Sequence, residues 1–137
     1  MSEPIRILCV DDEEYILHTL ERFCRNEGLV MRGAGSAVSG LEALAQEPCQ
    51  IVLSDYRMPG MNGLEFLREV VRRWPATVGI LVSGYAELPV VAQALERQEI
   101  FGFLRKPWSR VELREMIARA AAAGSAADPP SIERSRS

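Results

Sequence analysis

The sequence predicts a doubly wound α/β domain whose five-stranded parallel sheet carries helices on both faces. Short apolar runs alternate five times with longer amphipathic segments, which is the pattern of a parallel sheet covered by helices. The length of 137 residues suits one hydrophobic core and leaves little room for a second. Four of the five apolar runs lead directly into a polar or charged residue, as expected where sites form at the carboxyl ends of parallel strands.

The first two strand–helix pairs occupy the N-terminal third of the chain. Residues 5–10 (IRILCV) are predicted as a buried strand, and the segment behind them has apolar residues at helical spacing until Gly28. Residues 29–33 are a weaker strand. Ser36 can cap the helix that follows, and this helix is expected to end before Pro48.

The third and fourth pairs have clearer signals. Residues 51–54 (IVLS) form a second buried strand, and the turn at 58–63 (MPGMNG) leads into a helix with its apolar face between residues 64 and 74. Residues 78–82 (VGILV) are the next strand. Residues 89–98 place four apolar residues on one helical stripe.

The last pair completes the alternation. Residues 100–104 (IFGFL) are predicted as the fifth strand, and Ser109 can cap a final helix. We expect the domain to cover residues 1–123. Residues 124–137 (GSAADPPSIERSRS) lack periodicity and are predicted to be a disordered tail or the start of a linker.

Composition excludes several functional classes. The formal charge of −3 gives no general attraction to nucleic acid, and no apolar run approaches the ~20 residues that span a bilayer. No basic segment followed by an apolar one appears at the N-terminus, so no signal peptide is expected. Cys9, Cys24 and Cys49 are odd in number and have apolar neighbours, which is typical of reduced core thiols in a cytoplasmic protein.

The polar residues that follow the strands indicate a chemistry. Asp11 and Asp12 follow the first strand, Asp55 the third, Ser83 the fourth and Lys106 the fifth. Clustered carboxylates repel one another unless a cation or proton relieves them, and a small hard cation suits such oxygen ligands. With an ammonium and a hydroxyl nearby, this set of groups favours phosphoryl chemistry, in which a carboxylate can be the nucleophile.

We expect no part in this chemistry for Glu13, Glu14 or His18. Glu13 and Glu14 are expected only to favour the start of the next helix, because carboxylates are stabilised at helix N-termini. His18 lies on that helix and is expected to be a surface or partly packed residue.

Four motifs together give the chain a family resemblance. An acidic pair after the first strand (VDDEE), the segment DYRMPGMNG, Ser83-Gly84 and Lys106-Pro107 occur in the order found in receiver domains of two-component response regulators, the CheY-like superfamily. The resemblance covers about residues 4–121. It implies a flavodoxin-like sheet in the order 2-1-3-4-5, in which the first and third strands are neighbours at the switch point.

The resemblance implies a role for each matching residue around the acceptor. Asp55 resembles the residue that takes the phosphoryl group. Asp11, Asp12 and Asp55 resemble the magnesium-binding acids, together with the backbone carbonyl of Arg57. Lys106 resembles the ammonium that pairs with the acceptor and its phosphoryl oxygens.

Further positions resemble the switch and the residues that tune it. Ser83 resembles the hydroxyl that turns to the phosphoryl group, and Phe103 occupies the aromatic switch position but lacks the hydroxyl of the tyrosine common there. Pro107 is a candidate for a cis peptide bond. Arg57 and Tyr85, each two residues past a key position, match the side chains that set phosphoryl lifetime.

The implied function is signal relay, not turnover of a substrate beyond the domain's own phosphorylation and dephosphorylation. A histidine kinase or a phosphotransfer protein would donate the phosphoryl group. A downstream domain or protein would read a surface made by the fourth helix, the fifth strand and the last helix, and a homodimer could form through the same face. No direct contact with nucleic acid or membrane is expected.

The sequence allows three alternatives to a complete, phosphorylated receiver. The chain could be a receiver piece of a longer regulator with an output module such as a cyclic-dinucleotide phosphodiesterase, because the Lys-Pro-Trp segment at 106–108 is similar to receivers joined to such modules. It could be a pseudo-receiver that binds partners without phosphorylation. It could also be a small phosphatase of the haloacid-dehalogenase type, but those enzymes have Asp-x-Asp after the first strand, where this chain reads Asp-Asp-Glu at 11–13.

Overall fold

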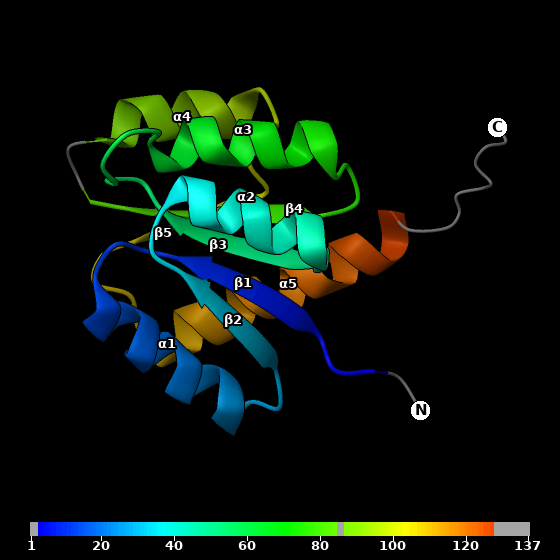
Figure 1. Ribbon diagram of the computed structural model, residues 1–137. Coiled ribbons are helices and arrows are strands. Elements are labelled where there is room, and N and C mark those ends of the chain that lie inside the picture. Colours follow the sequence, from blue (N-terminus) through cyan, green and yellow to red (C-terminus); the bar gives the residue numbers. More distant parts are fainter. Residues whose placement is uncertain (1–2, 85–86, 128–137) are drawn as a thin grey trace, which may run out of the picture.

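The computed structural model describes residues 3–84 and 87–127, which fold into one parallel sheet between two layers of helices (Figure 1). The strands are β1 (Arg6–Val10), β2 (Val30–Ala34), β3 (Ile51–Asp55), β4 (Val78–Ser83) and β5 (Gly102–Arg105). The helices are α1 (Glu14–Asn26), α2 (Ala37–Gln46), α3 (Gly63–Arg73), α4 (Leu88–Glu96) and α5 (Arg110–Ala127). No helix in the described ranges is long and apolar enough to cross a membrane.

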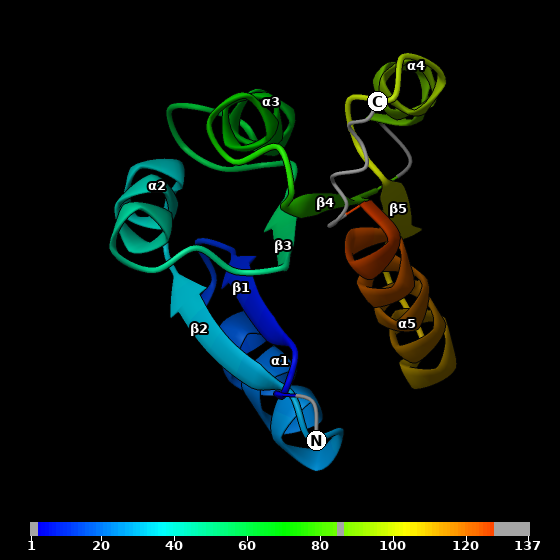
Figure 2. The same ribbon diagram turned by 90° about the vertical axis from the view of Figure 1, so that its right-hand side faces the viewer.

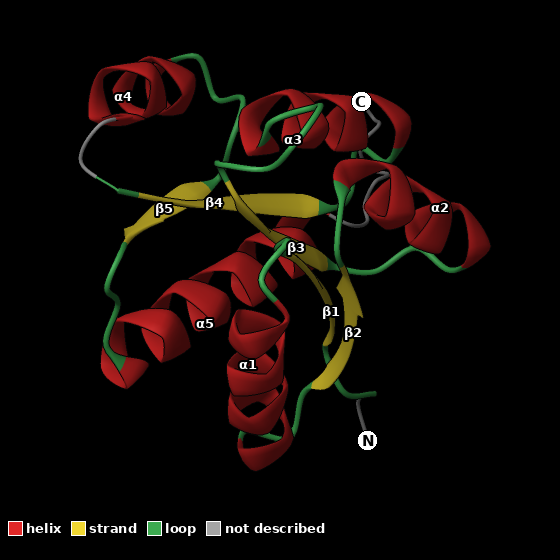
Figure 3. Ribbon diagram, turned by 60° about the vertical axis from the view of Figure 1, so that its left-hand side comes forward, coloured by secondary structure: helices red, strands yellow, loops and turns green. Residues whose placement is uncertain are grey.

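The sheet has the predicted topology. Its order is β2-β1-β3-β4-β5, and every neighbouring pair is parallel. Helices α2, α3 and α4 cover one face, and α1 and α5 cover the other (Figures 2 and 3). The doubly wound, five-stranded α/β fold is therefore confirmed, and the reversal of strand order lies between β1 and β3.

Each face of the sheet has its own core. The face under α2, α3 and α4 is packed around Phe66, Leu67 and Leu81. The face under α1 and α5 is packed around Ile80 and Leu113. β3 is buried along its whole length, as expected for a central strand covered on both sides. Cys9, Cys24 and Cys49 are free thiols inside these cores, as predicted.

Capping residues account for three helix starts. The Ser36 side chain accepts from the Ser39 N–H at the start of α2. Asn62 and Glu65 form a reciprocal capping box at α3. The pair Ser109 and Glu112 makes the same exchange at α5. Each exchange satisfies N–H groups that the helix itself leaves without partners.

The structure differs from the expectations at two ends of helices. Glu13 occupies the N-cap position of α1, but its side chain makes no capping hydrogen bond; Asp11 Oδ1 instead accepts from the Glu13 N–H at 2.9 Å. Helix α5 continues to Ala127, past Gly124, where the tail was expected to begin. Residues 128–137 lie outside the described residues, so a disordered tail stays a prediction.

Candidate functional site

Three carboxylates meet at the carboxyl edge of the sheet. Asp11 and Asp12 follow β1, and Asp55 ends β3; the register pairs Val10 with Ser54, so the two strands deliver these residues side by side. One carboxylate oxygen from each residue lies within 4.8 Å of the others. Asp11 and Asp55 are only 4% and 6% exposed, whereas Asp12 is exposed.

Burial and mutual repulsion disfavour the charged forms of the two buried acids, Asp11 and Asp55. Burial raises the pKa of Asp11 from 3.8 to about 6; the Glu13 N–H opposes this rise, and the negative charge of Asp55 adds to it. Burial also raises the pKa of Asp55, although the hydrogen bond and the charge of Lys106 lower it. A divalent cation would relieve this repulsion. The all-oxygen donor set, with one exposed member, therefore fits Mg²⁺.

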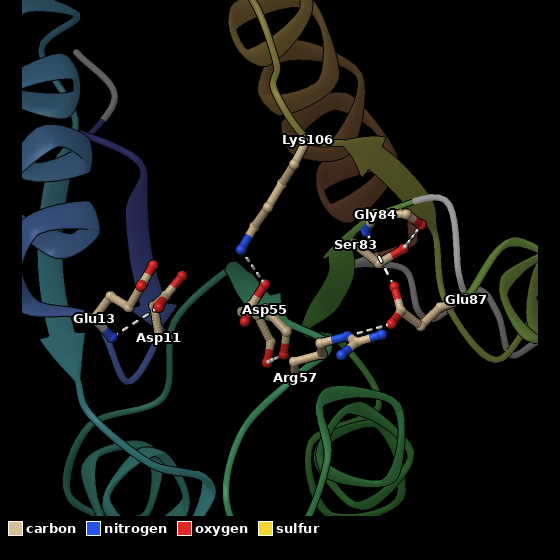
Figure 4. A network of polar contacts seen from close by, with 9 residues as sticks. Asp11, Glu13, Asp55, Arg57, Ser83, Gly84, Glu87 and Lys106 are labelled. Atoms are coloured by element: carbon tan, nitrogen blue, oxygen red, sulfur yellow. Dashed lines mark hydrogen bonds and ion pairs between the residues drawn. The ribbon is translucent and has the colours of Figure 1, made fainter.

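Lys106 supplies the positive charge next to this cluster. Its Nζ lies 2.7 Å from Oδ1 of Asp55 (Figure 4). Burial alone would lower the pKa of Lys106, but the hydrogen bond and the charge of Asp55 outweigh burial and raise it. The ammonium therefore stays protonated at neutral pH and holds one oxygen of Asp55. The Lys106–Pro107 peptide bond is cis, as the family resemblance implied.

Ser83 is brought to the same edge by the end of β4. It is 2% exposed, and its backbone carbonyl accepts from the Lys106 N–H at 2.9 Å. This bond ties the end of β4 to the residue that pairs with Asp55. Among the residues that the structure describes, the Ser83 hydroxyl donates to the neighbouring Gly84 carbonyl, over a long 3.4 Å. Such a weak contact leaves the hydroxyl available for a better acceptor.

Gly63 explains why the loop after β3 packs so closely against the acceptor strand. A Cβ atom at this position would lie 2.1 Å from the backbone oxygen of Asp55. The Gly63 N–H instead donates to the Tyr56 carbonyl at 2.9 Å. Within the same loop, Gly60 has a φ of +78°, which a glycine adopts without strain. Close packing at residue 63 and a positive φ at residue 60 thus explain why the segment DYRMPGMNG has glycine at both positions.

Glu87 is a polar residue of this region that the sequence analysis did not single out. It precedes α4, is 7% exposed and makes no side-chain capping bond to that helix. Its Oε2 pairs with Nε of Arg57, and its Oε1 accepts from the Gly84 N–H at 3.1 Å (Figure 4). An acid just before a helix is typical of an exposed N-terminal charge, so the sequence had no sign of its burial.

Two of the remaining predicted residues, Phe103 and His18, lie outside the cluster. Phe103 is half-buried in β5, paired with Leu81 in the register, and packs against the core under α2, α3 and α4. Tyr85 lies outside the described residues. His18 is exposed on α1, as expected.

A family model and individual relatives match this chain. The model for the response regulator receiver domain matches residues 7–118. The hydrogenase transcriptional regulatory protein HoxA of Cupriavidus necator is 34% identical over 114 residues, which cover 83% of this chain and 23% of that protein. The DNA-binding transcriptional regulator NtrC of Escherichia coli K12 is 34% identical over 111 residues, which cover 81% of this chain and 24% of NtrC. The chain thus spans about a quarter of the length of these relatives.

A solved structure agrees with the sequence relatives. The signal receiver domain of an HD domain-containing protein from Pseudomonas fluorescens Pf-5 superposes with a TM-score of 0.86 at 28% identity, covering 100% of this chain and 96% of that one. Taken with the sheet order and the acidic edge, these matches establish that the chain belongs to the response regulator receiver domains of two-component systems.

Proposed function

We propose that this domain receives a phosphoryl group on Asp55 and passes the signal on by a change of surface. The observation that supports this most is the 2.7 Å pair between Lys106 and Asp55 inside a cluster of carboxylates. It combines a nucleophilic oxygen with an ammonium beside it at the edge of the sheet. In such an arrangement, positioning and electrostatic stabilisation supply most of the catalysis of phosphoryl transfer.

The transfer is an in-line displacement. A carboxylate oxygen of Asp55 attacks the phosphorus of a phosphohistidine on a kinase or phosphotransfer protein, the P–N bond breaks, and its electron pair returns to the imidazole nitrogen. Lys106 neutralises charge on the acceptor and on the phosphoryl oxygens. Ser83, whose hydroxyl contacts the Gly84 carbonyl over a long 3.4 Å, turns to donate a hydrogen bond to the new phosphoryl group.

Asp11, Asp12, Asp55 and the backbone carbonyl of Arg57 would hold the magnesium ion. When bound, the ion offsets the negative charge that builds up on the phosphoryl oxygens. The raised pKa of Asp11 supports this assignment, because burial and the charge of Asp55 outweigh the opposing charge of Lys106 and leave the carboxylate short of positive charge. The exposure of Asp12 leaves a path for the hydrated ion to enter.

The output and the partners belong to the same proposal. Phosphorylation adds about −1.5 to −2 charges, and we expect it to shift the surface of α4, β5 and α5, with Phe103 as the side chain that changes its packing. A downstream domain, a separate protein or a second copy of the chain would read that surface. Since the relatives are about four times longer, a regulator in which this domain is joined to an output module is a further candidate.

We place this reaction in the cytoplasm. Histidine kinases present their phosphohistidine there, and the three buried cysteines are free thiols, which a reducing compartment preserves.

Intact mass after exposure to acetyl phosphate tests the proposal. With Mg²⁺, the chain should gain one phosphoryl group; with EDTA in place of the metal, and in Asp55→Asn, it should gain none. A mass gain that persists in Asp55→Asn would assign the acceptor elsewhere. No gain by a folded protein under any donor would favour the pseudo-receiver alternative.

A further inference from the structure

Glu87 stands apart among the buried acids. Of the described residues, three carboxylates are buried: Asp11, Asp55 and Glu87. The first two belong to the proposed metal and acceptor site, but Glu87 lies between the loop after β3 and the start of α4. A buried carboxylate is costly unless it is paired and hydrogen-bonded. Both of its oxygens have partners, which indicates a built contact and not an incidental surface pair.

The two partners of Glu87 come from the two loops that flank the acceptor. Arg57 is two residues past Asp55, and Gly84 directly follows Ser83. In Figure 4 the guanidinium of Arg57 points toward Glu87 and not toward the carboxylate of Asp55. Glu87 therefore holds the basic side chain nearest to the acceptor along the chain, and it also restrains the backbone beside the Ser83 hydroxyl.

We propose that Glu87 is a positioning residue for the acceptor site: it keeps Arg57 turned toward α4 in the resting protein and competes with a phosphoryl group on Asp55 for the guanidinium. This inference rests on the proposed phosphorylation of Asp55 and adds to it a residue that acts through Arg57. It also makes the start of α4 sensitive to phosphorylation, because Glu87 directly precedes that helix.

Charge and available space both support competition between Glu87 and a phosphoryl group for the Arg57 guanidinium. A phosphoryl group has about −1.5 to −2 charges and oxygens that a guanidinium can bind in a bidentate manner, whereas Glu87 has one charge. The Arg57 side chain is 73% exposed while that of Glu87 is 8% exposed. A hollow of about 510 Å³ adjoins the pair, and it is lined by Tyr56, Arg57, Met58, Pro59, Asn62 and Glu87. Arg57 thus has the freedom to turn, and Glu87 does not.

If the Arg57 side chain turns away, Glu87 loses its ion pair. Of its partners in the described part of the chain, the carboxylate would keep the Gly84 N–H and lose the cation, which is unfavourable for a buried charge. Movement of Glu87 toward water would relieve this and would release Gly84 and the first turn of α4 together. The pair therefore connects the charge at Asp55 to the position of α4.

A double-mutant cycle separates this role from general structural support. Glu87→Gln keeps an amide oxygen for the Gly84 N–H but removes the charge that holds Arg57. Arg57→Met removes the guanidinium while keeping the stem. The probe is beryllium trifluoride, a tetrahedral mimic of the phosphoryl group, with its affinity measured in Mg²⁺ by fluorine NMR. Glu99→Gln is the matched control, because it breaks another ion pair, which joins the residue before Ile100 to Arg68 of α3 at 3.0 Å, away from the acceptor edge.

We expect Glu87→Gln to bind the probe about fivefold more tightly than the parent, the size of a modest coupling between two charged groups. The same substitution in the Arg57→Met background should change nothing, and Glu99→Gln should match the parent. In the resting protein, the Arg57 Nε–H should give a protected NMR signal that is lost in Glu87→Gln.

The experiment distinguishes failure of the proposed role of Glu87 from failure of the proposed phosphorylation of Asp55. Equal tightening with and without Arg57, or no tightening at all, would overturn the role of Glu87 while leaving Asp55 as the acceptor. A parent protein that neither binds the probe nor takes up a phosphoryl group would overturn the proposed function, and the role of Glu87 with it.

Discussion

Replacing Asp11 by asparagine is expected to stabilise the metal-free protein at neutral pH. The amide keeps an oxygen for the Glu13 N–H, which now lies 2.9 Å from Asp11 Oδ1, but it removes a buried charge that faces Asp55. Because the pKa of Asp11 is raised from 3.8 to about 6 in the folded chain, the folded state binds this proton more tightly than the unfolded state does. Its contribution to stability is thus present at low pH and is lost as the pH rises from about 3.8 to about 6.

The size of the effect follows from the same shift. At about 1.4 kcal/mol per pH unit, a rise from 3.8 to about 6 corresponds to about 3 kcal/mol. The cluster is open to solvent at the exposed Asp12, and screening reduces this to about 1–1.5 kcal/mol. For a chain of this length, the melting temperature of Asp11→Asn should exceed that of the parent by about 3–6 °C.

Urea unfolding at pH 7.5 in EDTA is the direct assay, repeated at pH 4 and in 10 mM Mg²⁺. The advantage of the variant should shrink toward pH 4, where Asp11 is protonated in the folded parent. In Mg²⁺ the order should reverse, because an ion that binds only the folded parent stabilises it. A variant that is less stable than the parent in EDTA at pH 7.5 would refute the claim that the ionised cluster opposes folding.

Two further substitutions test the acceptor strand and its partner. Gly63→Ala should lower the free energy of unfolding by about 2–3 kcal/mol, because the added Cβ would lie 2.1 Å from a backbone oxygen. The better helix propensity of alanine returns at most about 1 kcal/mol of this loss. Gly35→Ala is the control: it has open space around its Cβ and should be near neutral in the same urea titration. Lys106→Met should slow phosphoryl uptake from acetyl phosphate by roughly 100-fold while leaving the fold intact, because it removes a preorganised charge at Asp55; an unchanged rate by mass spectrometry would contradict the role of the ammonium.

Much of the fold followed from periodicity. Short apolar runs between amphipathic segments predicted all five strands, and the boundaries moved by only one or two residues, as at β5, which begins at Gly102 and not at residue 100. The caps at Ser36 and Ser109 were predictable because their side chains act on their own helices. The acidic edge was predictable because the ends of parallel strands must meet.

The features that could not be predicted have separate physical causes. Glu87 has the sequence context of an ordinary helix start, and only the packing of α4 beside the loop after β3 buries it. Glu13 occupies the N-cap position of α1, but its side chain makes no capping bond, and Asp11 accepts from the Glu13 N–H in a local turn. The end of α5 was misjudged because Gly124 and its neighbours were interpreted as linker composition, while alanine on either side sustains the helix.

The acceptor edge and α4 are joined by a short series of hydrogen bonds, ion pairs and chain connections. Lys106 contacts both Asp55, through its side chain, and Ser83, through its backbone N–H. Ser83 leads to Gly84, which Glu87 holds, and Glu87 precedes the first turn of α4. A second connection runs from Asp55 through Arg57 to the same Glu87. Since both connections end at one buried carboxylate, a change of charge at Asp55 can act on α4 from two sides, and Glu87 is where these two effects combine.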